Sequence, residues 1–354
     1  MTNDKAKCIT EQKRIAYLDN LRVMASFAVV MIHVSAQNWY SQDVSAFAWK
    51  VFNVYDSLSR WAVPIFVMIS GALMLEKEYS LNKLYTNKIL RLLTAYCFWC
   101  VVYALIDGGS ARAVFLNIAK GKYHLWFIPL IMGLYISVPF IKKIVAERKI
   151  MEYFLAVAVI FSFLIPFTLK VLSDFGGSAA GEWMNALTDT YSDMYAAFDN
   201  GYIAYFVAGY YLNTVSMRRS NRIAIYILGA LGTVLTIFLS LYISAETGKP
   251  VVDYYEYLNL NVFVQSVAVF VFFKYSRILS KTPGMLRSKL SEYSFCIYVV
   301  HLLVMERLDK VFNINTLTCN PVLSVPALTI VVFILTSVIS ALIKQIPVLK
   351  NYIA

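Results

Sequence analysis

Arg22 and His33 are the residues of the first apolar stretch whose types and spacing could do chemistry. They are eleven positions apart. On an α-helix, two residues at this spacing lie within about 20° of the same face and roughly 16 Å apart along the helix axis. Asp19, Ser26 and Gln37 share that face, so a polar stripe is predicted on an otherwise apolar helix. Ionisable side chains at membrane depth usually face a protein interior or a water-filled cavity and carry function. The stripe therefore predicts the centre of an active site. The alternatives are that Arg22 snorkels to the inner headgroups and that His33 makes a purely structural hydrogen bond.

The histidines supply the candidate reactive groups. By residue count, His33 and His301 are both expected near mid-membrane. A histidine ordinarily titrates near pH 6.5, so it can act as a general base toward a hydroxyl or as a nucleophile that accepts an acyl group. Two histidines at this depth predict a shared polar cavity, with Tyr298 one turn before His301 as a supporting residue. His124 begins the fourth span at the expected outer interface, where it is either a supporting residue on the acceptor side or a solvated interfacial side chain.

Three further cations are candidates for binding anions. Lys88 and Arg91 are three residues apart, so they face one way at the inner end of the third span and could hold a phosphate group entering from the cytoplasm. Ordinary basic flanking of a membrane span explains the same pair. Arg60 can pair with Asp56, four residues earlier, and is expected at the outer end of the second span. There it either reaches an anionic acceptor or snorkels.

The composition indicates that membrane helices position these residues. Hydrophobic residues make up 59% of the 354 and charged residues only 15%, whereas soluble domains have about 45–50% and about 25%. No polar stretch is long enough for a soluble domain, so residues 1–354 are expected to form one transmembrane domain, with 1–14 as a short cytoplasmic segment. No cleavable secretory signal is evident, because the start of the chain is polar and charged.

About ten spans are predicted, which makes the expected fold an all-α polytopic membrane protein with both termini cytoplasmic. The expected spans are residues 17–38, 57–75, 89–106, 124–141, 151–172, 201–215, 223–245, 258–276, 292–312 and 322–343. With this topology, 23 of the 32 Lys and Arg residues lie on the inner side. The net charge of +11 therefore follows membrane orientation and does not indicate nucleic-acid binding.

An acidic connection and a pair of cysteines are two further features that could carry chemistry. The longest outer connection, residues 173–200, is acidic and is either a lid facing the acceptor or a solvated connector. Cys97 and Cys100 have CxxC spacing but lie within an apolar helix with no second pair, so packing is favoured over a zinc or redox site. Neither a metal nor a permanently bound cofactor is expected.

Several of these segments together resemble the membrane-bound acyltransferase-3 family. They are Arg22-x10-His33, Ser70-Gly71, Lys88-x-x-Arg91, Tyr123-His124-Leu125-Trp126-Phe127, Gly201-Tyr202 through Gly209-Tyr210-Tyr211, and Tyr293-Ser294 through His301. The resemblance covers nearly the whole chain. The family usually has arginine at the position of Lys88, and lysine keeps the charge but cannot bind a phosphate bidentately.

The resemblance implies transfer of an acyl group, usually acetyl, from cytoplasmic acetyl-CoA as co-substrate to a hydroxyl of a cell-surface polysaccharide or its lipid-linked precursor. It implies that His33 is essential and that Arg22 binds the donor or supports that histidine. It also implies a place in the bacterial cytoplasmic membrane. The alternative is a transporter or flippase of a lipid-linked sugar, since a buried polar path also suits a proton relay. Transporters often have interrupted helices at corresponding positions in the two halves of the chain, and this sequence shows no such pair, which argues against that alternative.

Overall fold

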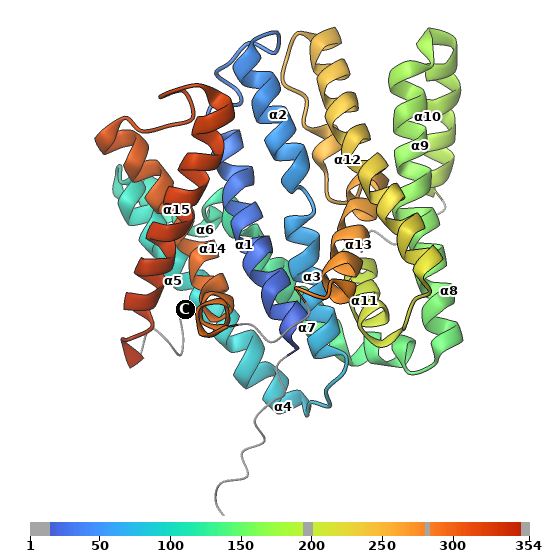
Figure 1. The fold of residues 1–354 in the computed structure, drawn as a ribbon, viewed down its shortest axis with the longest axis horizontal. Coiled ribbons are helices and arrows are strands. Elements are labelled where there is room, and N and C mark those ends of the chain that lie inside the picture. Colours follow the sequence, from blue (N-terminus) through green and yellow to red (C-terminus); the bar gives the residue numbers. More distant parts are fainter. Residues whose placement is uncertain (1–14, 194–200, 280–283, 348–354) are drawn as a thin grey trace, which may run out of the picture.

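The computed structural model describes residues 15–193, 201–279 and 284–347. Every regular element in these ranges is a helix, and they contain no strand. The helices stand side by side in one bundle (Figure 1). The prediction of an all-α polytopic membrane protein is confirmed.

The first half of the chain forms the helices that carry most candidate residues. They are α1 Ala16–Ala36, α2 Phe47–Ser59, α3 Ala62–Met74, α4 Leu81–Leu84, the π-helix η1 Tyr85–Ile89, α5 Leu90–Asp107, α6 Ala111–Lys120, the 3-10 helix η2 Tyr123–Trp126 and α7 Phe127–Val145. The second half continues with α8 Arg148–Ala158, the π-helix η3 Val159–Leu164, α9 Ile165–Phe175, α10 Gly177–Asp193, α11 Gly201–Thr214, α12 Arg219–Thr247, the 3-10 helix η4 Asp253–Tyr255, α13 Leu260–Tyr275, α14 Met285–Phe312 and α15 Pro321–Ile343.

Within the described ranges, eight helical segments are long and apolar enough to cross a membrane. They correspond to eight of the ten expected spans. The other two expected spans are also helices: α11 is short, with 14 residues, and packs against α3, whereas the longer α14 packs against α1 and α15. The start of α1 and the end of α15 lie at the lower end of the bundle in Figure 1. We call this the basic end, because Lys88, Arg91 and Lys344 line a cavity there.

The second span is interrupted, and this changes the position of Arg60. Its helix already begins at Phe47, breaks after Ser59 and restarts at Ala62. Pro64 explains the break, because it has no N–H for the carbonyl of Arg60 and its ring would clash with that carbonyl in a continuous helix. The expectation that Asp56 and Arg60 lie at the outer surface is therefore wrong. They lie in the middle of the membrane-spanning segment Phe47–Met74.

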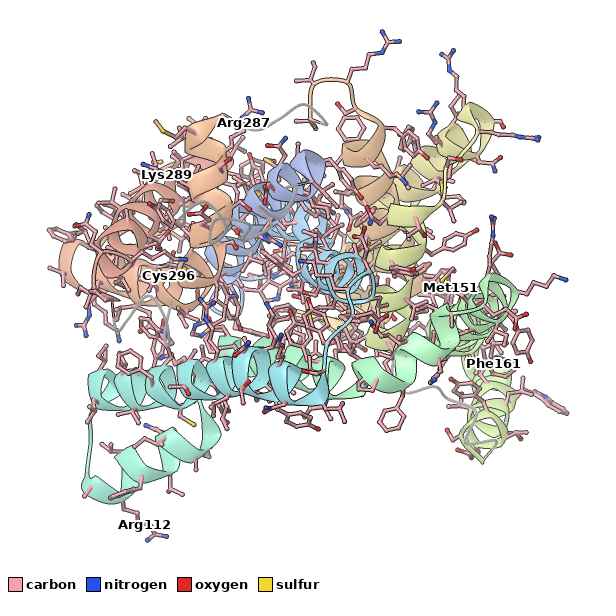
Figure 2. The ribbon with its side chains drawn as sticks, turned by 90° about the horizontal axis from the view of Figure 1, so that it is seen from below. Arg112, Met151, Phe161, Arg287, Lys289 and Cys296 are labelled. Atoms are coloured by element: carbon pink, nitrogen blue, oxygen red, sulfur yellow. The ribbon has the colours of Figure 1, made fainter. Side chains whose placement is uncertain are left out.

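The segment expected as a long outer connection, residues 173–200, is also different from the prediction. Most of it is the helix α10, which packs against α9, while residues 194–200 lie outside the described ranges. A further helix, α6, lies between the third and fourth expected spans and has no buried residue. Figure 2 shows α6, with Arg112, set apart from the rest of the bundle.

The close packing of α3 and α11 brings the middle of the bundle together. A Cβ atom at Gly71 would overlap the backbone carbonyl of Phe206, and one at Gly209 would overlap that of Met68. Glycine at both positions lets the two backbones approach, as small residues do at membrane helix interfaces. The adjacent Ser70 is thereby placed at a cavity in the centre of the protein. The Ser70-Gly71 step thus lies where α3 and α11 approach each other closely enough to exclude a side chain.

Candidate active site

All three histidines of the chain meet in one cluster. The ring centroids of His33 and His301 are 4.8 Å apart, those of His124 and His301 are 5.4 Å apart, and those of His33 and His124 are 6.3 Å apart. His33 comes from the last turn of α1, His124 from η2 and His301 from the middle of α14. Since α1 packs along α14, the structure brings together the two histidines that were predicted to share a cavity.

The cluster lies inside the protein. His301 and His124 are fully or almost fully buried, with His124 only 1% exposed. The interpretation of His124 as a solvated interfacial side chain is therefore wrong. Beyond His33, the side chain of Trp39 is also buried, and its ring lies against that of Trp49 with a centroid distance of 4.6 Å. The described side chains include no group of three His, Cys, Asp or Glu residues arranged to hold a metal ion.

Hydrogen bonding defines how His301 faces the cluster. Its Nδ1 lies 2.6 Å from the carbonyl oxygen of Tyr298, one turn earlier on α14. A carbonyl oxygen only accepts, so we assign the ring hydrogen to Nδ1, which leaves the lone pair on Nε2. That Nε2 and both ring nitrogens of His124 are buried without a hydrogen-bond partner among the described residues. Buried polar atoms without partners are rare and costly, and they mark where a substrate hydroxyl could bind.

Several contacts hold η2 so that His124 reaches the cluster. The hydroxyl of Tyr298 donates a hydrogen bond to the backbone carbonyl of His124. Just before η2, Lys122 forms ion pairs with Asp107 at the end of α5, 3.0 Å away, and with Glu306 of α14, 3.1 Å away. Tyr298 and Lys122 therefore fix this short helix to both of its neighbours.

Arg22 lies toward the basic end on the same helix as His33. Its guanidinium Nη1 is 3.4 Å from Asp19 Oδ1 and 3.2 Å from the Ser291 hydroxyl, which itself donates to Asp19 at 2.7 Å. This network ties α1 to α14. Ser26 uses its hydroxyl to donate to the backbone carbonyl of Arg22. Asp19 and Ser26 thus hold Arg22 and its helix, and these contacts do not involve the histidine cluster.

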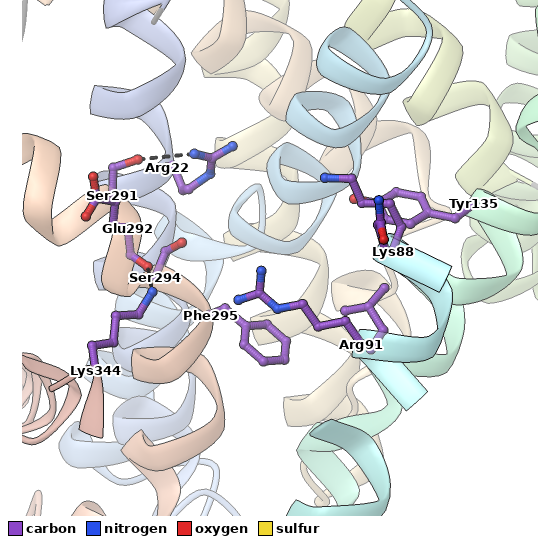
Figure 3. A pocket seen from close by; sticks show the side chains of 11 residues that line it. Arg22, Lys88, Arg91, Tyr135, Ser291, Glu292, Ser294, Phe295 and Lys344 are labelled. Atoms are coloured by element: carbon purple, nitrogen blue, oxygen red, sulfur yellow. Dashed lines mark hydrogen bonds between the residues drawn. The ribbon is translucent and has the colours of Figure 1, made fainter. Parts of the chain in front are cut away.

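A cavity of about 670 Å³, which we call the mouth, opens at the basic end. Figure 3 shows Arg22 above it, Lys344 on one side, and Lys88 and Arg91 on the other. Its lining residues are Arg22, Asn87, Lys88, Arg91, Leu92, Tyr135, Ser291, Glu292, Ser294, Phe295 and Lys344. Four cations and one carboxylate give the lining a net charge of +3 at neutral pH. The size is typical of a small-molecule site, and the charge favours an anionic ligand.

A second, narrower cavity of about 190 Å³, the throat, shares residues with the mouth and runs inward from it. The shared lining residues are Arg22, Leu92, Tyr135, Ser294 and Phe295. The throat also reaches Phe127 and Tyr298, whose ring centroids are 5.7 Å apart. The ring of Tyr298 is 5.8 Å from that of His124 and 6.2 Å from that of His301. The throat therefore extends from the mouth to Tyr298, whose ring packs against the histidine cluster.

Arg60 lies in the interior at the break between α2 and α3. Its guanidinium is 2.6 Å from Asp56, which is 1% exposed, and stands over the rings of Tyr255 and Tyr257 at 4.3 and 6.0 Å. Tyr257 and Tyr298 pack against the same small hydrophobic cluster around Ile32. Snorkelling does not describe this arrangement, because the charge is paired inside the protein.

Several aromatic rings lie at or near η2, the short helix that carries His124. Trp126 is stacked on Tyr257 with a centroid distance of 5.8 Å and lies 6.0 Å from Tyr202, while Tyr123 lies 5.7 Å from His33. Trp126 and Tyr123 are 40% and 61% exposed. We call Tyr123, Trp126, Tyr202 and Tyr257 the aromatic rim. The sequence carried a signal for it in the segment Tyr123–Phe127, which entered the prediction only as part of the family resemblance.

A basic mouth, a narrow throat and a buried histidine cluster define a site in which a group could pass from an anionic donor to an acceptor within the membrane. The chain matches the model of the acyltransferase-3 family, described as an acyltransferase domain, over residues 15–343. It therefore belongs to that family and is a multi-pass membrane acyltransferase. Comparisons with curated proteins and with solved structures gave no match.

Proposed function

We propose that this protein transfers an acetyl group from cytoplasmic acetyl-CoA to a hydroxyl of a surface polysaccharide or of its lipid-linked precursor, in the cytoplasmic membrane of a bacterium. The observation that carries the proposal is that the histidine cluster contacts both Tyr298, which lines the throat, and Tyr123 of the aromatic rim. A donor and an acceptor could each approach the same imidazoles from its own side.

The donor side is supported by charge and shape. Coenzyme A carries several phosphate charges at one end and a narrow, neutral pantetheine arm at the other. Lys88, Arg91 and Arg22 line the mouth, where they would bind the phosphates or the thioester region. The narrower throat suits the arm, and its end at Tyr298 would bring the thioester to the histidines.

The acceptor side is supported by the aromatic rim and by a resemblance within the family. Faces of sugar rings pack against aromatic side chains. Tyr123 presents such a face 5.7 Å from His33, and Trp126, at the end of the short helix that carries His124, stacks on Tyr257. The segments Leu18–Arg22, Val30–His33 and Asp56–Pro64 resemble the O-acetyltransferase that modifies enterobacterial common antigen. A polyprenyl-linked oligosaccharide is therefore the acceptor we propose.

In the proposed reaction, His33 acts as the general base. The acceptor oxygen attacks the thioester carbonyl carbon, a carbon–oxygen bond forms, and the carbon–sulfur bond breaks. The hydroxyl proton passes to His33 and then to the departing thiolate, which leaves as free coenzyme A. The Nε2 lone pair of His301 can accept a hydrogen bond from a second hydroxyl of the acceptor sugar, since its Nδ1 is bonded to Tyr298.

The second route is covalent. The acetyl group passes first to a nitrogen of His33 and then to the acceptor, so the proton and thiolate are released in separate steps. Donor alone should then leave an acetyl group on His33, which peptide mass spectrometry after rapid quenching can detect. General-base catalysis instead requires both substrates together, and donor alone leaves the protein unmodified.

The experiment that tests the function supplies purified protein with acetyl-CoA labelled in the acetyl group and with membrane glycolipid. Label on the glycolipid supports the transferase. Movement of glycolipid across a vesicle bilayer without label would instead support a transporter, an alternative to which the family match lends no support. Mass spectrometry of surface glycan from cells lacking the gene identifies the modified sugar.

A further inference from the structure

Three aromatic rings from three different helices meet along the throat. Phe66 belongs to α3, Phe127 is the first residue of α7, and Tyr298 lies in the middle of α14. All three line the throat and not the mouth. The ring centroids of Phe66 and Phe127 are 6.1 Å apart, and those of Phe127 and Tyr298 are 5.7 Å apart. We call these three rings the aromatic collar.

The order of residues along two helices shows where the collar lies in the throat. On α14, Ser291 lines the mouth alone and Tyr298 lines the throat alone, whereas His301, one turn further along, lines neither. On α7, Tyr135 lines both cavities. Phe127 is eight residues earlier and therefore about 12 Å further along the helix axis, and it lines the throat alone. The collar therefore forms the inner end of the throat, next to the histidine cluster.

Contacts outside the throat hold the collar in place. The hydroxyl of Tyr298 donates to the backbone carbonyl of His124, which fixes the orientation of the ring. Phe66, Phe127 and Tyr298 all pack against the small hydrophobic cluster around Ile32. The helix that carries Phe66, α3, is itself in close backbone contact with α11. Protein interiors packed in this way have little room for additional methylene groups, and forcing them in is unfavourable.

We propose that the aromatic collar limits the length of the acyl group, so that acetyl fits and a four-carbon chain does not. This inference rests on the proposed function and adds a specificity-determining feature to it. With the pantetheine arm in the throat, the thioester lies at the inner end and the acyl chain beyond the sulfur points at the collar. A two-carbon group ends there, whereas each further methylene has to displace a ring.

Binding of coenzyme A thioethers to the purified protein in detergent, measured by calorimetry, tests the proposal without any acceptor. S-ethyl-coenzyme A and S-butyl-coenzyme A carry two and four carbons on the sulfur and cannot transfer them, and free coenzyme A is the reference ligand. The variants are Phe66→Ala, the milder Phe66→Leu and, as a matched control, Phe140→Ala. Phe140 is a 75% exposed phenylalanine of α7 that lines neither cavity. Thermal unfolding of each variant verifies that the fold is kept.

We expect the unmodified protein to bind S-ethyl-coenzyme A about as tightly as free coenzyme A, and S-butyl-coenzyme A about tenfold or more weakly. Phe66→Ala should reduce the difference between the two thioethers to about twofold or less, because the missing ring leaves room for the longer chain. Phe66→Leu should give an intermediate difference, and Phe140→Ala should leave the difference unchanged.

Two outcomes overturn the proposal: equal binding of both thioethers by the unmodified protein, and an unchanged difference between them in the folded Phe66 variants. In either case coenzyme A still binds, so the proposed donor stands and only the role of the collar fails. If the unmodified protein does not bind even free coenzyme A, the proposed donor is wrong and the role of the collar falls with it.

Discussion

The imidazole rings of His33 and His301 lie 4.8 Å apart, although one belongs to the first described helix and the other to the last but one. His124 from η2 completes the group. Histidines from three distant parts of the chain meet in the interior beside the throat, and their ring nitrogens are only partly satisfied by the protein. This arrangement is the basis of the first two predictions.

Replacing His33 by alanine should abolish acetyl transfer, with a loss of at least about a hundredfold, because it removes the group that takes the acceptor proton or the acyl group. His301→Ala should cause a smaller loss. Transfer of label to glycolipid measures both, and size-exclusion profiles verify that the variants are folded. Substantial activity in the His33 variant would remove this residue from the reaction.

Replacing Tyr298 by phenylalanine should lower the turnover rate about tenfold. The variant keeps the ring that lines the throat but loses the hydroxyl that donates to the carbonyl of His124, so η2 is held less firmly. The backbone carbonyl that accepts from His301 is unchanged. Donor KM should therefore stay constant while kcat falls. An equal change in both constants contradicts this positioning role.

Replacing Arg22 by alanine should mainly impair use of the donor. The guanidinium lines both the mouth and the throat, and its loss also leaves Asp19 without its cation. We expect the KM for acetyl-CoA to rise about tenfold or more, with partial recovery in Arg22→Lys, which restores the charge without the planar geometry. Steady-state kinetics with acetyl-CoA as the varied substrate measure this effect. Unchanged dependence on the donor excludes Arg22 from this role.

Replacing Trp126 by alanine should raise the KM for the acceptor glycolipid about tenfold and leave the KM for acetyl-CoA unchanged, because the variant loses a stacking face of the aromatic rim. Trp183→Ala is the matched control, since Trp183 is an exposed tryptophan on α10, away from the histidines. Similar kinetics for both variants would show that the rim does not contact the acceptor.

Replacing Gly71 by alanine should destabilise the protein by about 3 kcal/mol or more, because the new methyl group overlaps the backbone of α11 and the two helices must separate. Gly133→Ala on α7 is the control. A Cβ there meets nothing within 4 Å, so the unfolding temperature should stay the same or rise slightly. Thermal unfolding in detergent compares the two, and equal stability would contradict the close contact.

The sequence predicted the helical membrane fold well because spans are long and apolar, and each needs only its own residues to be recognised. It also predicted that His33 and His301 share a polar cavity, since two costly side chains at similar depth favour one another. Their rings do meet, 4.8 Å apart, but neither lines the mouth or the throat. It placed Arg60 wrongly at the outer end of the second span. The span already begins at Phe47, and Pro64 interrupts its helix near Arg60, so Arg60 lies in the middle of the span. His124 was ambiguous for a related reason: an aromatic segment at a span end looks the same whether it faces lipid or folds inward. Lys344 gave no signal beyond basic flanking, because its place opposite α5 depends on packing between distant helices.

The difference in size between the mouth and the throat, about 670 against about 190 Å³, has a consequence for the membrane as a barrier. Under the proposed function, a coenzyme A donor bound in the mouth would stay on the side from which it came, and only its uncharged arm would enter the throat. The acetyl unit would then be exported while every phosphate charge remains behind. No net charge crosses with it, so export of the modification would leave the electrical potential across the membrane intact.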